Sequence, residues 1–318
     1  MSPTYDVLAM GRSSIDLYAH QIGVPITEVT SFDAYVGGCP TNISVGARRL
    51  GLRSALLTAL GEDQVGDFVL AFLQKEGVET AFIPRKPGYR TSAVILTIQP
   101  PDRFPLTYYR EGCADRQLTC EDVRRAPVED SAIVVVSGTG LTHEPSRSAT
   151  LFAADRASNA GAQVFVDLDY RPDQWGSRAE FAAASQRLLA RSSIAVGTEE
   201  EVIAAADDDD LERAIAVVLR SGPETLVVKR GAAGASIYTP GSLPRVIPAF
   251  PIVVLNVLGA GDAFASGLIS GLRRGLPLDR AVRMGNAVGA IVVTRHGCAN
   301  FMPTEAEVEQ FVAEKGGW

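Results

Sequence analysis

The chain contains little cysteine or histidine, the side chains that most often hold transition metals in proteins. Its four cysteines lack Cys-x-x-Cys spacing and its three histidines lack the spacing of paired metal ligands; these residues are Cys39, Cys113, Cys120, Cys298, His20, His143 and His296. We therefore expect reduced thiols, with neither a disulfide nor a zinc site. Cys39 and Cys113 lie within motifs, where a small apolar filler is the expected role.

An excess of basic residues is also missing. Lys and Arg number 30 against 37 Asp and Glu, which gives a net charge of −7 and a pI near 5.2. Because nucleic-acid binding requires a basic face, this balance argues against a nucleic-acid partner. An anionic small molecule would have to be held by local arginines.

Long apolar runs are absent as well. Runs such as Ala132–Val136 are far shorter than the roughly 18 residues that a membrane helix needs. Residues 1–10 show no basic segment, long apolar stretch or cleavage site, so we expect a cytoplasmic protein with no membrane partner. With 46% hydrophobic residues, the chain has enough apolar side chains for a large core, and we expect one domain over residues 1–318.

Two common nucleotide-binding loops do not occur. The segment Ser137-Gly-Thr-Gly-Leu-Thr-His143 follows a strand pattern, but His143 stands at the third glycine of G-x-G-x-x-G, which argues against a dinucleotide-binding fold. The phosphate-binding pattern G-x-x-x-x-G-K-[ST] is missing. The acidic run Asp207–Asp210 precedes a helical pattern, and we interpret it as a solvated helix start rather than a metal site.

Strand and helix patterns alternate along most of the chain. The strand candidates are Val7–Met10, Ser54–Thr58, Ile133–Val136, Val164–Val166, Ile194–Val196 and Leu226–Val228, and the helical segments between them are about 64–75, 146–159, 178–190 and 211–220. Such alternation predicts an α/β fold, with a central, mostly parallel sheet and helices on both faces.

The early part of the chain departs from this alternation. Within residues 12–36 and 79–110, short strand patterns such as Thr91–Ile98 and Leu106–Tyr109 have no helix between them. We interpret these segments as a small β-lid that covers a site and excludes water.

The most informative segment is Asn256-Val-Leu-Gly-Ala-Gly-Asp-Ala-Phe-Ala-Ser-Gly267, which ends in a helical pattern. Gly259 and Gly261 allow an anion to approach the backbone, and free N–H groups at a helix start attract negative charge. A phosphoryl group in transfer would be stabilised there, with Asp262 accepting the proton of an attacking hydroxyl. The alternative is that Asp262 merely caps the helix.

This segment resembles the C-terminal signature of the PfkB (ribokinase-like) family of sugar and nucleoside kinases. The match runs through Gly259, Ala260, Gly261 and Asp262, and continues at Phe264 and Gly267. Asn256 and Val257 replace the usual Asp and Thr. The resemblance implies a ribokinase-like fold, ATP and Mg²⁺ as cofactors, room for a monovalent cation such as K⁺, and a homodimer formed through the lid.

A second segment matches the family independently. Val36-Gly37-Gly38-Cys39-Pro40-Thr41-Asn42 leads into a helical run, and Pro40 suits a first helical turn. Gly37 and Gly38 would let the backbone pass close to a polyol, and Asn42 offers both a donor and an acceptor to hydroxyls. An ordinary loop into a helix is the alternative.

Four further residues are expected to bind the substrate: Asp16, Tyr108, Arg110 and Arg171. Asp16 follows the first strand, where related kinases place a carboxylate that binds sugar hydroxyls; a turn aspartate is the alternative. Arg110, close to Tyr108, and Arg171 resemble positions used by sugar-acid kinases of the family. Guanidinium groups bind carboxylates through paired donors, so the two arginines are expected to bind the carboxylate of a sugar acid. The alternative is that these arginines form structural ion pairs with nearby acidic residues, among them Asp115 and Asp169.

Longer stretches narrow the resemblance to one subgroup. The combination of 109–116, 167–175, 197–201, 254–259 and 295–299 resembles the members that phosphorylate 5-dehydro-2-deoxy-D-gluconate in myo-inositol breakdown, and these share the Asn256–Val257 departure. The implied reaction transfers the γ-phosphate of ATP to the terminal 6-hydroxyl of that acid. A 2-dehydro-3-deoxygluconokinase, a fructokinase or a sugar-binding regulator on a kinase scaffold are the alternatives.

The nucleotide side is implied more coarsely by the same resemblance. Thr198 and Glu201 stand where the family has N-x-x-E, so Glu201 is expected to act on Mg²⁺ through water. Further positions that resemble the nucleotide site, near the phosphates or flanking the adenine, are Lys229, Gly231, Gly234, Asn286 and Gly297.

Overall fold

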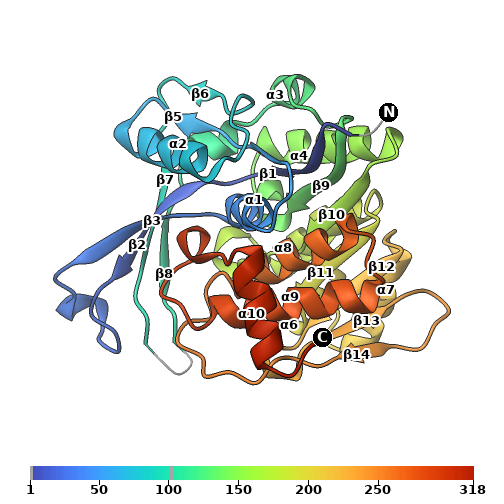
Figure 1. Cartoon of the computed structure of the whole chain (residues 1–318). Helices are drawn as coiled ribbons and strands as arrows, with labels where there is room; N and C mark the ends of the chain where they lie inside the picture. Colours follow the sequence, from blue (N-terminus) through green and yellow to red (C-terminus); the bar gives the residue numbers. More distant parts are fainter. Residues whose placement is uncertain (1–2, 100–102) are drawn as a thin grey trace.

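The computed structural model describes residues 3–99 and 103–318; residues 1–2 and 100–102, the latter within the expected lid range, lie outside the described residues. Across the described ranges, eight strands form one central sheet in the order β14-β13-β12-β11-β10-β9-β1-β4 (Figure 1). These strands are β1 (Tyr5–Met10), β4 (Ser54–Leu57), β9 (Ser131–Ser137), β10 (Gln163–Asp167), β11 (Ile194–Thr198), β12 (Thr225–Lys229), β13 (Ala235–Tyr238) and β14 (Arg245–Ile247).

Six neighbouring strands of this sheet pair in parallel, in the order β4, β1, β9, β10, β11 and β12. Strands β13 and β14 add an antiparallel edge beside β12. The six expected core strands are therefore confirmed, each within a few residues of its expected ends. The mostly parallel α/β fold is confirmed with them. Side chains alternate across the sheet, so Leu8 and Met10 pack into one layer while Val7 and Ala9 pack into the other.

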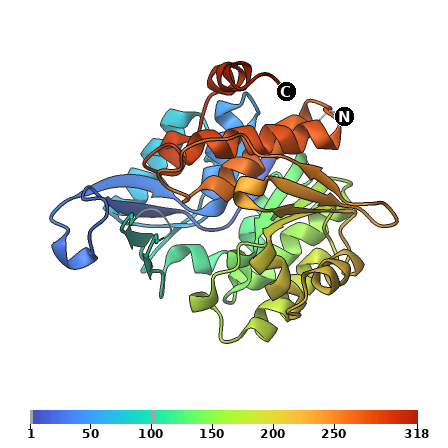
Figure 2. The same ribbon diagram turned by 90° about the horizontal axis from the view of Figure 1, so that it is seen from below.

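Helices cover both faces of the sheet, as Figure 2 shows. On one face lie α1 (Cys39–Arg49), α2 (Gln64–Glu76), α8 (Ala260–Arg273) and α9 (Leu278–Val292), with α10 (Glu305–Glu314) outside α9. On the other face lie α3 (Cys120–Arg125), α4 (Ser146–Asn159), α5 (Arg178–Leu189), α6 (Glu199–Ala206) and α7 (Leu211–Arg220). The helices expected at 64–75, 146–159, 178–190 and 211–220 are confirmed, and Asp210 caps α7 by accepting from the Arg213 N–H.

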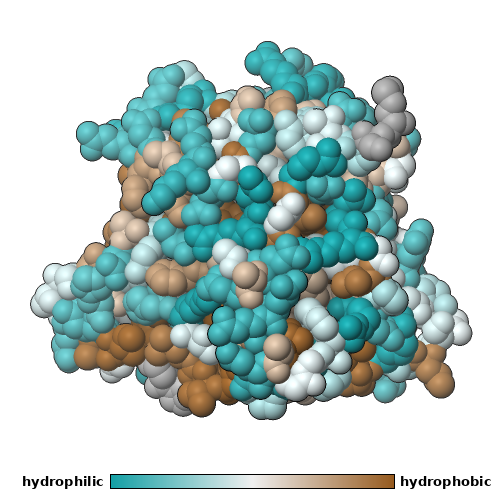
Figure 3. All heavy atoms as spheres, in the orientation of Figure 1, coloured by the Kyte–Doolittle hydropathy of each residue, from teal (hydrophilic) through white to brown (hydrophobic). Residues whose placement is uncertain are grey.

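A second sheet extends to one side of the molecule, in the order β3-β2-β7-β8. Its strands are β2 (Ser14–Ala19), β3 (Phe32–Gly37), β7 (Ser92–Leu96) and β8 (Leu106–Tyr109), and the short pair β5 (Leu60–Gly61) and β6 (Arg85–Lys86) lies apart from it. These strands form where the sequence indicated a lid. Figure 3 shows apolar side chains along the lower edge of this sheet, and Ile22, Ile26 and Phe32 are partly exposed near its tip. The homodimer through this sheet stays a prediction.

Among residues 3–99 and 103–318, no helix is long and apolar enough to cross a lipid bilayer. The longest strand, β9, is largely apolar and lies buried between the two helical layers, as expected for a parallel strand covered on both faces.

Helices α8 and α9 pack closely because glycines lie at their contact. A Cβ added to Gly267 would lie 2.8 Å from Val288 Cγ2 and 2.9 Å from the Met284 carbonyl oxygen. These distances are shorter than van der Waals contact, and one of the opposing atoms is backbone. The packing of α8 fixes where its first turn, with the Gly-Ala-Gly-Asp motif, meets the sheet.

We predict that Gly267→Ala lowers the free energy of unfolding by about 1–3 kcal/mol, because the added methyl group overpacks this contact. Gly289→Ala in α9 is the matched control, since its Cβ would meet nothing closer than 3.4 Å and alanine favours helix. Urea unfolding of both variants measures the difference. Equal stability of the two variants would contradict the packing argument.

Candidate active site

A pocket lies beside the carboxyl ends of β1 and β10. The N-termini of α1 and α8 and residues of the second sheet complete its lining. Ligands of open α/β sheets gather at this edge. The residues that line it are Arg12, Asp16, Tyr18, Gly38, Cys39, Asn42, Val94, Leu96, Leu106, Tyr108, Thr139, Asp169, Arg171, Gln174, Leu258, Gly259, Asp262 and Cys298.

The Gly-Ala-Gly-Asp segment forms the first turn of α8. Gly259 is the residue before the helix and has φ +78°, a left-handed conformation that favours glycine. Within the described residues, no backbone carbonyl accepts a hydrogen bond from the N–H groups of Gly259, Gly261 or Asp262. The Ala260 N–H, in contrast, donates to the Val257 carbonyl. The helix begins two residues before Asp262, and in the part of the chain that the structure describes no side-chain cap hydrogen bond is present at its start. The alternative in which Asp262 merely caps the helix is therefore wrong.

Asp262 faces the start of α1. Its Oδ2 accepts a 2.7 Å hydrogen bond from Asn42 Nδ2, so the two sequence motifs meet in one contact. Burial and the nearby Asp169 charge raise the pKa of Asp262 to about 6, although the Asn42 hydrogen bond opposes the rise. A carboxylate with this pKa is ionised at neutral pH and is a stronger base than an ordinary aspartate.

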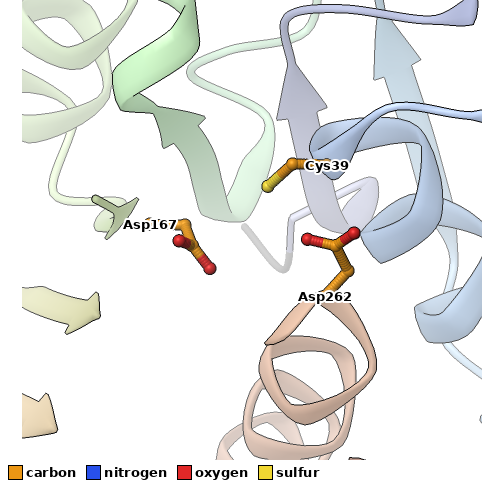
Figure 4. A group of neighbouring side chains, drawn as sticks. All are labelled: Cys39, Asp167 and Asp262. Atoms are coloured by element: carbon orange, nitrogen blue, oxygen red, sulfur yellow. The ribbon is translucent and has the colours of Figure 1, made fainter. Parts of the chain in front are cut away.

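Cys39, Asp167 and Asp262 converge from three different elements, as Figure 4 shows. Asp167 is the last residue of β10, and burial raises its pKa to about 7 despite the charge of Lys229. Lys229 Nζ lies 3.7 Å from both Asp167 Oδ2 and Glu201 Oε2. A Cβ added to Gly261 would lie 3.0 Å from Lys229 Nζ, so this ammonium group adjoins the first turn of α8.

Asp16 lies on β2 and lines the pocket. It is 6% exposed, it accepts a 2.6 Å hydrogen bond from Ser14 Oγ, and burial raises its pKa. A Cβ at Gly37 would lie 1.8 Å from Asp16 Oδ2, and one at Gly38 would lie 2.2 Å from the Arg12 carbonyl oxygen. The two glycines therefore leave room for the Asp16 carboxylate and for the backbone turn into α1.

Two guanidinium groups line the pocket. Arg171 pairs with Asp169 at 2.8 Å, yet its side chain is 42% exposed and reaches the pocket. Arg12, which the sequence reasoning passed over although it precedes Asp16 in the same segment, lies over the Tyr108 ring at 5.4 Å and donates to Ser14 Oγ. The arginine's place directly after a core strand was the signal that could have identified it.

Arg110 does not line the pocket, so the expectation that it contacts the substrate requires correction. Its guanidinium group is 3% exposed and donates to Asp115 at 2.7 Å, to Gln174 at 2.8 Å and to the Thr139 carbonyl at 3.1 Å. The structural ion pair is the arrangement that the protein adopts. A buried guanidinium group needs this compensation, and three of the roughly five N–H donors of an arginine are engaged in it.

The expected nucleotide residues lie along the ends of β11 and β12. Thr198 and Glu201 form the capping box at the start of α6, where Thr198 N–H donates to Glu201 Oε2 at 2.7 Å. Gly231 and Gly234 have φ of +52° and +91° in the turn after β12. A Cβ at Gly234 would lie 2.1 Å from the Ile247 carbonyl, which explains this glycine by packing.

Asn286 and Gly297 have structural contacts of their own. Asn286 Nδ2 donates to the Ile247 and Pro248 carbonyls and so ties α9 to the end of β14. A Cβ at Gly297 would lie 2.4 Å from the Phe301 ring and 3.4 Å from the Tyr35 ring, so this glycine sits beside the second sheet. Their expected places beside adenine stay predictions.

The comparisons with known proteins agree with this geometry. The sequence profile described as pfkB family carbohydrate kinase matches residues 5–305. The chain belongs to the pfkB family of carbohydrate kinases. A curated relative named 5-dehydro-2-deoxygluconokinase, from Shouchella clausii (strain KSM-K16), is 34% identical to this kinase over 314 residues, which are 98% of this chain and 96% of the relative.

Solved structures resemble the fold throughout. Aminoimidazole riboside kinase from Salmonella enterica, complexed with aminoimidazole riboside and an ATP analog, is 26% identical with a TM-score of 0.83, and the match covers 96% of this chain and 99% of the other. A fructokinase double mutant from Vibrio cholerae O395, with fructose, ADP and potassium bound, is 25% identical with a TM-score of 0.86, covering 98% and 99%. The ribokinase-like fold of this pfkB kinase is thereby confirmed.

We predict that Arg110→Met lowers the free energy of unfolding by about 3–5 kcal/mol, because it leaves the Asp115 carboxylate buried without its partner. The double variant Arg110→Met/Asp115→Leu should recover most of that loss. Arg124→Met, at an exposed pair with Glu121, is the control and should cost less than about 1 kcal/mol. Guanidinium chloride unfolding measures all three. Unchanged stability of Arg110→Met, together with a raised KM for a sugar acid, would restore a substrate role for Arg110.

Proposed function

We propose that this pfkB kinase transfers the γ-phosphoryl group of ATP to the terminal 6-hydroxyl of 5-dehydro-2-deoxy-D-gluconate, with Asp262 as the general base. The observation that carries the proposal is the position of the Asp262 carboxylate, which faces the pocket at the start of α8. Beside it lie N–H groups that have no backbone partner among residues 3–99 and 103–318. The name of the curated relative, similar over nearly the whole chain, supports the choice of acceptor.

Phosphoryl transfer depends on positioning and on stabilising charge that develops on the transferred group. The N–H groups of Gly259, Gly261 and Asp262, together with the positive end of the α8 dipole, would bind that charge. Lys229 adjoins the same turn and is held by Asp167 and Glu201. Burial alone would lower the pKa of Lys229, but these two carboxylates outweigh burial and raise it, so the side chain stays cationic.

Asn42 and Asp16 would bind hydroxyl groups of the sugar. Asn42 Oδ1 is buried and has no hydrogen-bond partner in the described part of the protein, whereas its Nδ2 is engaged by Asp262. A buried amide oxygen without a partner costs free energy that a ligand hydroxyl would recover. The same Asn42 side chain therefore orients the base and offers an acceptor to the substrate.

Arg12 and Arg171 would bind the carboxylate of the acid. Both guanidinium groups line the pocket, and a neutral sugar would not require two of them there. In this proposal Arg12 takes the role that the sequence analysis predicted for Arg110. Two cationic groups favour a sugar acid over fructose as the acceptor.

Mg²⁺ bound with ATP would neutralise charge on the β- and γ-phosphates. The donors present fit such an ion, because Glu201 offers a carboxylate near Lys229 and Mg²⁺ in kinases is held mostly by phosphate and water. Glu201 would act through water. K⁺ would serve as a monovalent cation, as the potassium bound to the related fructokinase supports.

A panel of acceptors with coupled detection of ADP tests the function. The panel includes 5-dehydro-2-deoxygluconate, 2-dehydro-3-deoxygluconate, fructose and a nucleoside. The proposal requires the highest kcat/KM with the first compound. Turnover with none of them would favour a sugar-binding regulator on a kinase scaffold.

We predict that Asp262→Asn lowers kcat by about 10²–10⁴-fold, because the asparagine cannot accept the hydroxyl proton. The dissociation constant of ATP, measured by calorimetry, should change little, since the backbone N–H groups of the turn remain. A kcat within a fewfold of wild type would contradict the role of Asp262 as base.

The pH dependence of kcat/KM gives a separate test. Because the pKa of Asp262 is raised to about 6, activity should fall as pH drops through about 6 with the loss of one ionised group. An ordinary aspartate would keep its charge to much lower pH. The residual activity of Asp262→Asn should lack this fall, and a wild-type profile flat down to pH 4.5, about 1.5 units below that pKa, would count against the assignment.

We predict that Arg12→Met raises KM for the sugar acid by about tenfold or more and leaves KM for a neutral acceptor within a fewfold, because the carboxylate is the substrate group that the guanidinium group is proposed to bind. Arg220→Met, at the exposed end of α7, is the matched control and should change neither. Steady-state kinetics with both acceptors measure the ratio. Equal losses with acid and neutral acceptors would show that Arg12 does not read the carboxylate.

A further inference from the structure

The cluster of Cys39, Asp167 and Asp262 has a geometry that the proposed phosphoryl transfer does not require. Cys39 is the first residue of α1, Asp167 the last of β10, and Asp262 the third of α8. One sulfur or oxygen atom from each lies within 4.8 Å of the other two. Figure 4 shows the three side chains directed toward one another.

Asp167 is the second and independent sign of a ligand at this place. It is 2% exposed, and its Oδ2 has no hydrogen-bond partner in the part of the chain that the structure describes. Lys229 Nζ lies 3.7 Å away, which is too far for a hydrogen bond. The Lys229 ion pair offsets the charge of Asp167 but supplies no hydrogen bond to Oδ2, and a cation held between the three side chains would supply the missing direct contact.

The donor set selects the class of cation. Mg²⁺ prefers oxygen ligands in octahedral geometry, whereas a thiolate favours softer ions, Zn²⁺ above all. Three protein ligands with an open fourth position is the arrangement of accessible zinc sites. Tetrahedral Zn²⁺ places sulfur and oxygen ligands about 3.5 Å apart. The three ligand atoms lie within 4.8 Å of one another, so the distances between them would have to shorten by up to about 1 Å when the ion binds.

Charge agrees with a divalent ion. With the thiol proton released to solvent on binding, the three ligands would carry three negative charges. The ammonium group of Lys229 lies 3.7 Å from both Asp167 and Glu201, so it offsets only part of this charge. The remaining negative charge favours a divalent cation.

We propose that Cys39, Asp167 and Asp262 form a site for a thiophilic divalent cation such as Zn²⁺, and that the bound ion inhibits turnover by occupying the Asp262 carboxylate. The inhibition rests on the proposed function, because it requires Asp262 to be the base. The binding does not, since it depends only on the three ligands.

Cadmium binding tests the site without turnover. Wild type, Cys39→Ser and Cys120→Ser are titrated with Cd²⁺ in the absence of nucleotide and sugar, and absorption from thiolate-to-cadmium charge transfer is recorded. Cys120, partly buried at the start of α3, provides the matched control. We expect the absorption in wild type and Cys120→Ser with one Cd²⁺ per chain. In Cys39→Ser the absorption should be lost and the affinity reduced by about tenfold or more.

Inhibition is then measured with Zn²⁺ at saturating Mg²⁺ and ATP, each variant relative to its own rate without zinc. The Zn²⁺ concentration that halves the rate should rise by about tenfold or more in Cys39→Ser and stay unchanged in Cys120→Ser. Absorption that persists in Cys39→Ser, or its absence from wild type, would overturn the site. A third outcome is cadmium binding that depends on Cys39 while zinc does not inhibit turnover. That result would overturn the proposal that the bound ion blocks Asp262, and it would count against Asp262 as the base.

Asp167→Asn covers the case in which Cys39→Ser does not fold. This variant keeps the thiol but loses one charged ligand, so its affinity for Cd²⁺ should fall by about tenfold or more. Circular dichroism melting confirms that each variant is folded. Unchanged affinity in folded Asp167→Asn would overturn the proposal.

Discussion

The hydrogen bond between Asn42 Nδ2 and Asp262 Oδ2 is the contact on which the site depends. It joins the start of α1 to the start of α8, so both helix N-termini point at one place. Around it, burial keeps the Asp262 carboxylate partly desolvated and raises its pKa to about 6. A base of moderate strength and a cluster of N–H donors thus result from the packing of two helices on one sheet edge.

Charged side chains at this edge are arranged in compensating sets. Lys229 lies between Asp167 and Glu201, and Arg171 pairs with Asp169. Each set keeps a buried charge tolerable while leaving one member close to the pocket. The Arg110–Asp115 pair follows the same rule without reaching the pocket, which separates a structural arginine from those available to a ligand.

Much of the fold followed from local pattern. The core strands are continuous apolar runs, and a helix such as α7 has clear amphipathic spacing, so these elements are visible in sequence. The antiparallel edge β13–β14 was not expected, because Ala235–Tyr238 and Arg245–Ile247 are short and their pairing depends on the turn between them. In the same way, Gly259–Asp262 and Asn42 could be recognised as motifs, whereas the convergence of Cys39 on Asp262 depends on tertiary packing.

The arginines show where sequence reasoning ends. Arg12, Arg110 and Arg171 all lie close to the ends of strands, and their residue type gives no indication of direction. Arg110 turns toward Asp115 and Gln174, while Arg12 lies over Tyr108 and lines the pocket. Position along the chain predicted the neighbourhood of these side chains, and only the folded backbone decides which of them faces the ligand.

The Asn42–Asp262 contact joins residues that are 220 positions apart in the chain. During synthesis from the N-terminus, the first half of the cleft is complete long before its partner leaves the ribosome. A truncated or nascent polypeptide that stops short of α8 would contain the glycine-lined entrance to α1 without the Asp262 carboxylate that faces it. The pocket is therefore completed late in biosynthesis, when the last third of the polypeptide closes onto a sheet edge laid down by the first.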